Sequence, residues 1–591
     1  MFHARRTRTL LLLFLLLAML AASLGYGQPA AASSGPALNV NAGASQHPID
    51  PLIYGMNFAD ETLAQELRLP VNRWGGNATT RYNWQNDMAN HASDWYFENI
   101  PADNPDPASG NAADHFVADN KNAGADSLIT ITLIGWVAKN RARTDGGYDC
   151  GFSTNTYNYT PAPLYQGQSP TDPYNPASAD CGTGKRTDGM FVTGNDPHDT
   201  SIAVAPAFMQ DWVRHLIAKF GNAMNGGVRF YNLDNEPGLW NSTHRDVHPT
   251  HPMYDELLNL GCQYAAAIKA VDPGALILGP VQDGWTRYYY ASYDTYPDQV
   301  AQDDRTAHGG KPFVVWYLQQ MAACATLHGA RMLDYFDLHY YPQANGVTLS
   351  PAGDANTQAL RLRTTRSLWD PNYVDESWIP STGEATPVNG VGVNGAVQLI
   401  PRMRDWVNKN YPGTKLAISE YNWGALDDIN GALAQADVLG IFGREGLDLA
   451  TLWDPPAASD PGAFAFRMYR NYDGAGSAFG DTSVSAASAD QGQLAIYAAR
   501  RGDGRLTLMV INKSNTALTS SVGLTGFTSV APAQVYRYSA ADLQHIVRQP
   551  DQAVSGSGFS ATFPAASITL IVLSSTNLSL SPRGYLPLVR R

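Results

Sequence analysis

Cysteine and charged residues are scarce in this sequence. The 591 residues include four cysteines, and Asp, Glu, Lys and Arg together make up only 16% of the chain. No Cys-X-X-Cys pair and no His/Cys cluster occurs, so the ligand spacing of a zinc site is missing and we expect no catalytic metal. The formal net charge of −13 argues against a polyanionic partner such as nucleic acid and favours a neutral one.

Long apolar runs are missing everywhere except at the N-terminus. Basic residues at positions 3–8 precede the apolar stretch 10–24, and small residues follow, which predicts a secretory signal and short linker over residues 1–33. A transmembrane anchor is the alternative, but the apolar run falls short of the roughly 20 residues that span a bilayer. We therefore expect a secreted, extracellular protein that has no membrane contact after signal removal, and we expect a monomer.

The pairing of the four cysteines stays open. Cys150 and Cys181 bracket a loop rich in Gly, Asn, Tyr and Pro, and outside the cell they could close it as a disulfide. Cys262 and Cys324 lie in helical patterns, 257–271 and 313–328, and are interpreted as buried thiols, with a bridge between adjacent helices as the alternative. Four cysteines allow three pairings, and the sequence does not choose among them.

A chain of this length predicts more than one domain. Apolar strands alternate with amphipathic helices such as 206–220, the pattern of parallel βαβ units. The candidate strands are eight: 53–58, 71–74, 127–134, 229–235, 276–279, 335–339, 416–420 and 450–453. This predicts an α/β fold, a TIM-like (β/α)8 barrel over residues 50–468 whose active site lies at the C-terminal ends of the strands.

The pattern of the sequence changes beyond Tyr469. After the Gly/Ala/Ser-rich segment 474–492, short strands follow without helices at 494–498, 506–511, 534–538 and 567–573, which predicts an antiparallel β-sandwich. Residues 37–41 are a candidate strand of the same domain, so we assign it residues 34–49 plus 469–578, with a tail at 579–591. We expect this domain to support the barrel, with carbohydrate binding as the alternative.

Two glutamates end predicted strands in the same way. Glu236 stands at the tip of the β-prone run 229–235, and Pro237 after it cannot donate to a strand ladder. Glu420 ends the apolar run 416–419. On the strand count these acids close the fourth and seventh strands and face each other across the barrel mouth. The alternative for each is an ordinary capping or paired acid.

Two facing carboxyl groups are the equipment for cleaving a glycosidic bond. One donates a proton to the leaving oxygen, and the other attacks the sugar or activates water. A separation of about 5–5.5 Å would mean retention of configuration through a glycosyl-enzyme intermediate. We expect the charge of the second carboxylate to raise the pKa of the acid.

Further polar and aromatic residues end other strands. His339 and Tyr341 close the sixth strand, Trp453 the eighth, and Arg73 with Asn77 the second, so each is a candidate for substrate binding. For each the alternative is a satisfied core polar group or a packing aromatic. Tryptophans near the predicted active face suggest a cleft in which rings stack on sugars, although some must belong to the core; these are Trp74, Trp84, Trp95, Trp136, Trp240 and Trp423. Asp234 shares the face of Glu236, but such residues are more often held in barrel hydrogen bonds.

Three stretches closely resemble glycoside hydrolase family 44. They are residues 227–244, residues 73–77 with 81–84, and residues 419–424, and the similarity runs from about Leu38 to Leu573. The resemblance implies a retaining endo-β-1,4-glucanase, with activity on xyloglucan in several members, built as a TIM-like barrel plus a β-sandwich.

The resemblance also implies roles for individual residues. Carried onto this sequence, Glu236 is the general acid/base, Glu420 the nucleophile, Asn235 the group that binds the 2-hydroxyl of the sugar at the cut, and Trp453 the platform under that sugar. The insert between Cys150 and Cys181 matches no family pattern, which leaves the subsites beside it open. Members can carry a structural calcium, but no EF-hand-like run marks a site here.

These observations predict a secreted retaining endo-β-1,4-glucanase that acts on cellulose-type glucans, with xyloglucan as a further candidate substrate. The nearest alternative is another barrel-plus-sandwich retaining glycosidase, an arabinofuranosidase or a xylanase. A different class is a barrel that binds polysaccharide without cutting it. The loss of one acid would be its signature, and both acids are present.

Overall fold

The structure is a computed structural model that describes residues 32–102, 110–139, 149–161, 180–295 and 302–575. The predicted signal at 1–33 lies almost entirely outside the described residues, as does the predicted tail at 579–591. No helix among the described residues has the length and apolar character needed to cross a bilayer.

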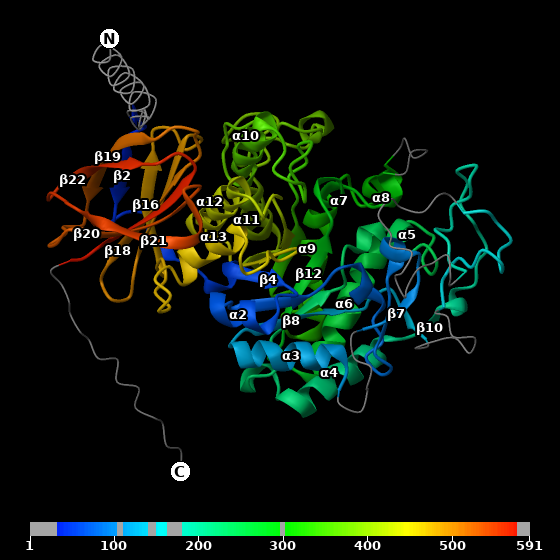
Figure 1. Cartoon of the computed structure of the whole chain (residues 1–591). Coiled ribbons are helices and arrows are strands. Elements are labelled where there is room, and N and C mark those ends of the chain that lie inside the picture. The colour runs from blue at the N-terminus through cyan, green and yellow to red at the C-terminus, as the bar shows by residue number, and fades with distance from the viewer. Residues whose placement is uncertain (1–31, 103–109, 140–148, 162–179, 296–301, 576–591) are drawn as a thin grey trace, which may run out of the picture.

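Eight parallel strands close into a barrel, as the sequence predicts (Figure 1). Their order around the barrel follows the chain, and β15 pairs with β4 to close the ring. The fourth strand leads to Glu236, and the seventh carries Glu420. The strands are β4 (Gly55–Asn57), β5 (Val71–Trp74), β8 (Asp126–Ile131), β11 (Phe230–Leu233), β12 (Leu276–Gln282), β13 (Tyr335–His339), β14 (Lys415–Tyr421) and β15 (Leu449–Leu452).

Helices surround the barrel and bury one apolar side against it. In α4 (Pro206–Phe220) a proline opens the first turn, and the buried residues Met209, Trp212, Val213 and Leu216 recur at helical spacing. The other long helices are α2 (Glu61–Leu67), α3 (Ala112–Ala123), α6 (Tyr254–Val271), α9 (Phe313–His328), α10 (Ala355–Thr364), α11 (Leu399–Asn410), α12 (Ile429–Glu445) and α13 (Pro461–Arg470).

The barrel interior changes from apolar to polar along its axis. A layer of Val71, Leu128, Phe230, Leu278 and other buried residues fills the end where the strands begin. Towards the other end the interior residues are polar and fully buried. They include Asn57, Arg73, Asn232, Asp337 and Ser419. The buried polar groups therefore concentrate at the C-terminal mouth, where active sites of this fold lie.

A β-sandwich forms the second part of the molecule, and β2 (Leu38–Asn41) joins it from the N-terminus between β16 and β19. The strand β16 pairs with β17 through its first residues and with β2 through its last, so it passes from one sheet to the other. Besides β2, the main strands of the sandwich are β16 (Thr482–Ser488), β17 (Leu494–Arg500), β18 (Leu506–Asn512), β19 (Leu518–Thr525), β20 (Ala533–Ser539), β21 (Asp542–Gln552), β22 (Gly558–Phe563) and β23 (Ser567–Leu573).

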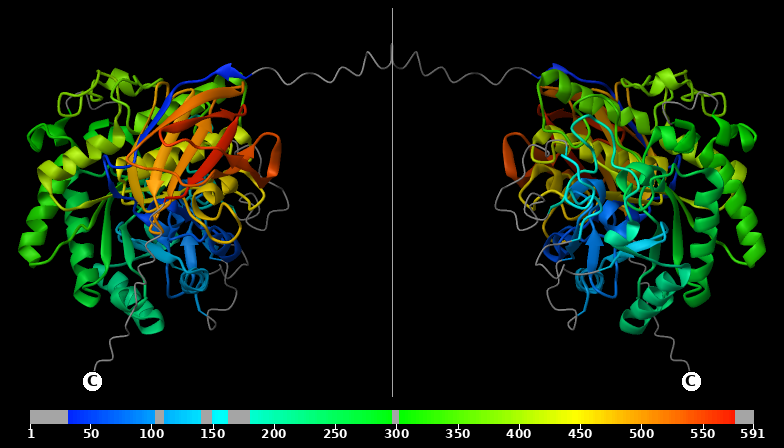
Figure 2. Two further views of the ribbon diagram at one scale, coloured as in Figure 1. Left: turned by 90° about the vertical axis from the view of Figure 1, so that its left-hand side faces the viewer. Right: turned by 90° about the vertical axis from the view of Figure 1, so that its right-hand side faces the viewer.

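The sandwich packs against α12 and α13, the helices that follow the last two barrel strands (Figure 2). Asp437 of α12 accepts hydrogen bonds from the Tyr497 hydroxyl at 2.7 Å and from Lys513 Nζ at 2.6 Å, and both partners belong to the sandwich. Phe464 of α13 stacks on Tyr538 with ring centroids 4.7 Å apart. The sandwich thus backs the helices next to the strands that carry Glu420 and Trp453.

Both pairs of cysteines are disulfides. Cys150 bonds to Cys181, one of the predicted possibilities, and Cys262 bonds to Cys324. The interpretation of Cys262 and Cys324 as buried thiols is therefore wrong. The two residues lie on α6 and α9, which pack side by side, and the Cα atoms are 6.1 Å apart, within reach of a bridge.

Candidate active site

Glu236 and Glu420 meet at the barrel mouth. Glu236 follows β11 in the left-handed backbone region, with φ 46° and ψ 52°, immediately before the short helix that Pro237 opens. One carboxylate oxygen from each glutamate and a ring nitrogen of His339 lie within 4.8 Å of one another. Both carboxylates are mostly buried, with 15% of the Glu236 side chain and 6% of the Glu420 side chain exposed. The acids from the fourth and seventh strands thus share one pocket.

Glu420 is held by charge and by hydrogen bonds on both oxygens. The Nη1 atom of Arg73 donates to Oε1 at 2.7 Å, and the hydroxyl of Tyr341 donates to Oε2 at 2.9 Å. The Arg73 side chain is fully buried. A buried guanidinium stabilises the ionised form of a neighbouring carboxyl group, so this environment suits a nucleophilic carboxylate.

Glu236 has the opposite environment. Burial raises its pKa from 4.5 to about 7, against the lowering effect of Arg73, and the carboxylate of Asp94 adds to the rise. The predicted cause of the rise, the charge of the second carboxylate, is therefore wrong, because burial is the main cause in the structure. A carboxyl group with such a pKa keeps its proton near neutral pH and can serve as a general acid.

His339 lies between the two acids and is fully buried. Its Nδ1 atom is 2.8 Å from Glu236 Oε1 and 3.4 Å from Glu420 Oε2, while Nε2 is 3.2 Å from the hydroxyl of Ser419. Burial lowers the pKa of His339 to about 4, so the ring is neutral near pH 7. Because two carboxyl groups face Nδ1, the single ring proton belongs there, and Nε2 accepts from Ser419. His339 therefore donates a hydrogen bond to the acid.

A network of buried polar residues fixes Arg73. Its Nε donates to Asn232 at 2.7 Å, and its Nη1 donates to Asn57 at 3.0 Å. Asn232 in turn donates to Asp337, whose other oxygen accepts from the backbone of Ser419. Arg73 is a predicted donor to sugar hydroxyls or to a carboxylate, and in the structure its Nη1 donates to the carboxylate of Glu420.

Sequence reasoning missed Asn57, Asn232, Asp337 and Ser419. The alternation of strand residues contained a usable signal, because Asn232 lies four residues before Glu236 and Asp337 two residues before His339. A polar residue at an inward position of an otherwise apolar strand points to such a network. Asp94 lies in the short 3-10 helix Ala92–Trp95 and Asp283 in a loop, so neither had such a pattern.

Asn235 and Asn77 lie beside the acids. Asn235 Oδ1 accepts from Arg73 Nη2 at 2.9 Å and from the backbone of Gly76 at 3.1 Å, and its Nδ2 donates to Asn77 at 3.2 Å. Asn77 also donates to both carboxylate oxygens of Asp94. The structure thus joins the predicted residues Arg73, Asn77 and Asn235 in one connected group.

Trp453 borders this group through Gly76. A Cβ atom on Gly76 would lie 2.5 Å from the Trp453 ring, and Gly76 has φ 86°, so both the close approach and the backbone require glycine. The Trp453 side chain is partly exposed, and the exposed Phe58 meets its edge with centroids 6.5 Å apart. The structure therefore brings Trp453 to the same end of the barrel as the acids.

Other predicted aromatic residues have packing contacts. Trp84 packs against Phe208 and His215 of α4, with ring centroids 5.9 and 5.3 Å away, and Trp136 meets His198 edge-on. These contacts hold both rings against packing partners, and substrate binding by Trp84 and Trp136 stays a prediction. Trp240 and Trp423 are fully buried core residues.

Asp234 is held in barrel hydrogen bonds, the second of its two predicted roles. Its oxygens accept from Thr80, from the backbone of Asn235, and from the backbone of Leu133 and Ile134. These bonds offset part of the effect of burial, which raises the pKa of Asp234 to about 6. Asp234 therefore fixes the end of β11, from which Glu236 extends.

Two groups among the described residues have the spacing of metal ligands. In one, Cys262 and Cys324 are already bonded to each other beside His328. The other is the pair of acids with His339. Neither is the all-oxygen set that calcium prefers, so a structural calcium stays a prediction.

Comparisons with known proteins agree with this geometry. The family model of glycoside hydrolase family 44 matches residues 88–344. The crystal structure of CelM2, a bifunctional glucanase-xylanase from a metagenome library, is 42% identical, covers 92% of this chain and 100% of its own, and has a TM-score of 0.84. The chain belongs to glycoside hydrolase family 44. The predicted resemblance is confirmed, and the protein is a glycoside hydrolase.

Two further relatives extend the comparison. A xyloglucanase of this family from Paenibacillus polymyxa is 28% identical over 92% of this chain and 100% of its own, with a TM-score of 0.73. A β-mannanase/endoglucanase A from Caldicellulosiruptor saccharolyticus is 31% identical over 85% of this chain. The present family 44 chain spans 36% of the length of that protein.

Proposed function

We propose that the protein is a retaining endo-β-1,4-glucanase in which Glu236 is the general acid/base and Glu420 the nucleophile. The observation that carries the proposal is the approach of the two carboxyl groups within 4.8 Å. Retaining glycosidases hold their carboxyl groups about 5–5.5 Å apart, whereas inverting enzymes need about 6.5–9.5 Å to admit a water molecule. The contrast between a protonated Glu236 and an Arg73-paired Glu420 supports the division of roles.

In the first step, an oxygen of Glu420 bonds to the anomeric carbon while the bond from that carbon to the leaving oxygen breaks. The proton of Glu236 passes to the leaving oxygen. Because Glu236 Oε1 accepts from His339, the proton to be transferred resides on Oε2. The His339 N–H then stabilises the carboxylate that the transfer leaves.

In the second step, water attacks the anomeric carbon and Glu236 takes up the proton of that water. The bond to Glu420 breaks, and its carboxylate returns to the hydrogen bonds of Arg73 and Tyr341. Asn235 is suited to hold the 2-hydroxyl of the sugar, and Trp453 to lie beneath it. Both lie next to Gly76 at the mouth.

The substrate class follows from the relatives and from the chemistry of the chain. The names of the three relatives mention glucan, xylan, xyloglucan and mannan activities. The negative net charge favours a neutral polysaccharide. We place a β-1,4-glucan first and xyloglucan second, and keep xylan as an alternative because the relative that is 42% identical is a glucanase-xylanase.

Secretion is also part of the proposal. All four cysteines are joined in disulfides, which persist in oxidising surroundings such as the extracellular space.

The test is a substrate panel. Reducing-end release is measured on carboxymethylcellulose, xyloglucan, xylan, mannan and an aryl arabinoside with the wild type, Glu236→Gln and Glu420→Gln. We expect release from the glucans and a loss of at least about 10³-fold in both variants. Activity on xylan or the arabinoside alone would overturn the substrate class. Wild-type turnover in both variants would overturn the catalytic roles.

A further inference from the structure

A second concave site lies near the acids, beside the segment that follows the Cys150–Cys181 insert. It is a pocket of about 760 Å³, within the range of small-molecule binding sites. One side is formed by residues from 183–197, which follow the Cys150–Cys181 insert, and the other by α5 (Trp240–Thr243) and the loop that follows it. Its lining includes Phe191, Thr193, Asn195, Asn241 and Ser242.

Two routes connect this pocket with the catalytic acid. On one side, Ser93 lines the pocket, and its neighbour Asp94 is close enough to raise the pKa of Glu236. On the other side, His251 lines the pocket and lies near Arg287, which is 3.9 Å from Asp283, a carboxyl group in electrostatic contact with Glu236. Asp94 also accepts from Asn77, which is bonded to Asn235 beside Glu236, so the pocket lies next to the catalytic mouth.

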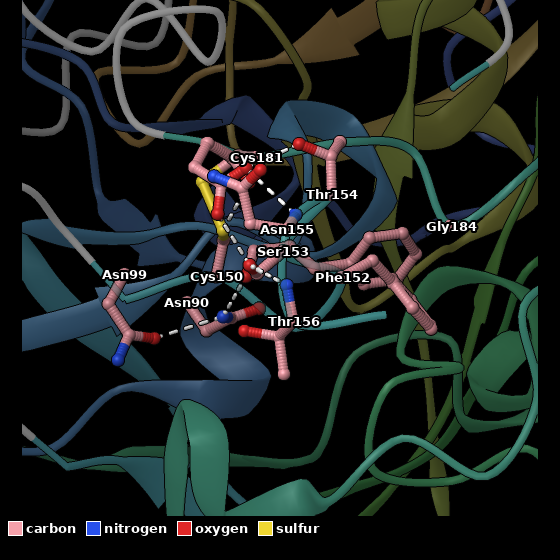
Figure 3. Close-up of a disulfide and its surroundings, with 12 residues drawn as sticks. Asn90, Asn99, Cys150, Phe152, Ser153, Thr154, Asn155, Thr156, Cys181 and Gly184 are labelled. Carbon is pink, nitrogen blue, oxygen red and sulfur yellow. Dashed lines mark hydrogen bonds between the residues drawn. A yellow bond between two sulfur atoms is a disulfide. The ribbon is translucent and has the colours of Figure 1, made fainter. Parts of the chain in front are cut away.

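The insert side of the pocket is fixed by a disulfide (Figure 3). The bond between Cys150 and Cys181 ties its ends together, and the neighbouring Asp180 accepts from the Ser153 hydroxyl at 2.6 Å and from the backbone of Asn155 at 3.0 Å. Such cross-links hold a binding surface in place before a ligand arrives, which lowers the entropy cost of binding.

Arg245 joins the insert to the barrel. Its guanidinium stacks on Phe152 and Phe191 at 4.3 and 4.4 Å, and it donates to the backbone carbonyls of Val192 and Thr183. The adjacent Asp246 forms a buried ion pair with Arg81. The strongest charges at the base of the pocket are thus already engaged within the protein.

Apart from Lys185 and His251, the remaining lining side chains carry no charge and suit a neutral, hydroxyl-rich ligand. Phe191 is 56% exposed, with Arg245 4.4 Å and Lys185 6.0 Å from its ring centroid, so part of the ring is open to a ligand. Thr193, Asn195, Asn241 and Ser242 bring uncharged hydrogen-bonding side chains to the same pocket. An open aromatic ring beside amide and hydroxyl groups is the combination that recognises a sugar, since its C–H face stacks and its hydroxyls bond.

We propose that this pocket is a distal sugar subsite that binds a neutral glycosyl unit of the polysaccharide away from the bond that is cut. The proposal rests on the proposed function, because it assumes that a glycan chain lies in the cleft. The unit is either part of the main chain or a side branch. Both present the same ring chemistry, and the experiment separates them.

The test compares Phe191→Ala with Met190→Ala. Met190 precedes Phe191 and is 67% exposed, but it does not line the pocket, so it is a matched control. Steady-state kinetics are measured with a short aryl cellobioside, with cellohexaose and with a xyloglucan oligosaccharide. We expect Phe191→Ala to raise KM about tenfold on one or both long substrates, since a stacking contact is worth about 1.4 kcal/mol. The value of kcat on the long substrates should stay unchanged, and so should both kinetic constants on the aryl cellobioside.

The pattern of effects identifies the source of the unit. A KM increase on both long substrates assigns the pocket to the main chain, and an increase on the xyloglucan oligosaccharide alone assigns it to a branch. Equal KM values for Phe191→Ala, Met190→Ala and wild type on both long substrates would overturn the proposal. An equal effect on the aryl cellobioside would also overturn it, because the variant would then disturb the catalytic centre.

A binding measurement keeps the inference separate from the proposed function. Calorimetric titration of both oligosaccharides into Glu236→Gln, alone and combined with Phe191→Ala or Asn241→Ala, requires no turnover. If the wild type cuts no glucan, the proposed function fails, and the titration still decides the inference. About tenfold weaker binding in both combined variants supports the subsite. Unchanged binding of both oligosaccharides in the combined variants contradicts it.

Discussion

Glu236 combines its proposed catalytic role with an unfavourable environment. The side chain is mostly buried, and burial keeps it protonated to about pH 7. His339 and Arg73 have fixed positions around it, and Asp94 adds a negative charge from an exposed position. The residue therefore has a pKa suited to proton transfer, and the protein carries a cost in stability for that pKa.

The pH dependence of the reaction follows from this pKa. Because the first step needs protonated Glu236, kcat/KM should fall about tenfold per pH unit above about pH 7. Asp94→Asn removes a charge that raises the pKa, so its basic limb should move to lower pH. Initial rates on an aryl cellobioside from pH 5 to 9 measure the basic limb of the wild type and of Asp94→Asn. An unchanged limb in Asp94→Asn would show that Asp94 does not act on the acid.

The free energy of unfolding should also depend on the ionisation of Glu236. In the unfolded chain Glu236 ionises near pH 4.5, and in the folded chain near 7, so the folded state loses stability as pH rises between these values. Glu236→Gln cannot ionise and should therefore be more stable than wild type at pH 8, by up to about 3 kcal/mol, and similar to it at pH 4. Urea unfolding at the two pH values measures the difference. A variant less stable than wild type at pH 8 would contradict the assigned pKa.

Sequence reasoning found the residues at strand ends and missed those inside strands. Glu236, Glu420, His339, Tyr341 and Trp453 were predicted because each follows an apolar run at the mouth of the barrel. Asn57, Asn232 and Asp337 lie within the strands, where alternation can mark an inward polar residue but does not identify the residue to which it bonds. Their role depends on contacts between strands far apart in the sequence, such as the bond between Arg73 and Asn232.

Among the elements, the buried parallel strands could be predicted from the sequence, whereas the exposed antiparallel strands could not. The eight barrel strands are short apolar runs, since both of their faces are covered. In the sandwich, β16 and β19 are rich in Ser, Thr, Gly and Ala, and most of β21 is exposed. Pairing with neighbouring strands forms these elements, and a single sequence does not contain that information.

The bridge between α6 and α9 was not predictable for a similar reason. A helical pattern does not reveal which side of one helix faces another, so Cys262 and Cys324 appeared to be separate thiols. Only the packing of the two helices around β12 brings them together.

Removal of this bridge should destabilise the protein without changing its chemistry. The bond joins residues 62 apart in the sequence and limits the freedom of the unfolded chain. The double variant Cys262→Ala/Cys324→Ala should lose about 2–4 kcal/mol of unfolding free energy, with kcat unchanged, since both cysteines lie in the outer helices. Urea unfolding and steady-state rates test this. An unchanged midpoint would contradict the assigned stabilisation.

At the scale of the whole molecule, the barrel and the sandwich share buried contacts that behave as one core. Lys513 and Asp437 form an ion pair whose side chains are 2% and 1% exposed, and Tyr497 and Thr365 also bond to the same carboxylate. A helix beside the nucleophile strand thus depends on the sandwich. This arrangement supports the predicted role of the sandwich as a buttress.

Breaking this pair from the sandwich side should weaken the whole molecule. Lys513→Met leaves the Asp437 carboxylate buried without its counter-charge, which should cost about 3–5 kcal/mol of unfolding free energy. Lys409→Met, whose ammonium pairs with Asp405 on an exposed surface, is the control and should change stability by less than about 1 kcal/mol. Calorimetry should show a single transition that moves only in Lys513→Met. Separate transitions for the two domains would contradict a shared core.

The most direct test of the account is the stereochemistry of cleavage. Proton NMR of the products, recorded in the first minutes of hydrolysis of a β-1,4-glucan oligosaccharide, reports which anomer forms first. Two carboxyl groups this close, with Glu420 as nucleophile, predict that the β-anomer appears first and mutarotates later. Initial appearance of the α-anomer would mean direct attack by water and would contradict the central claim.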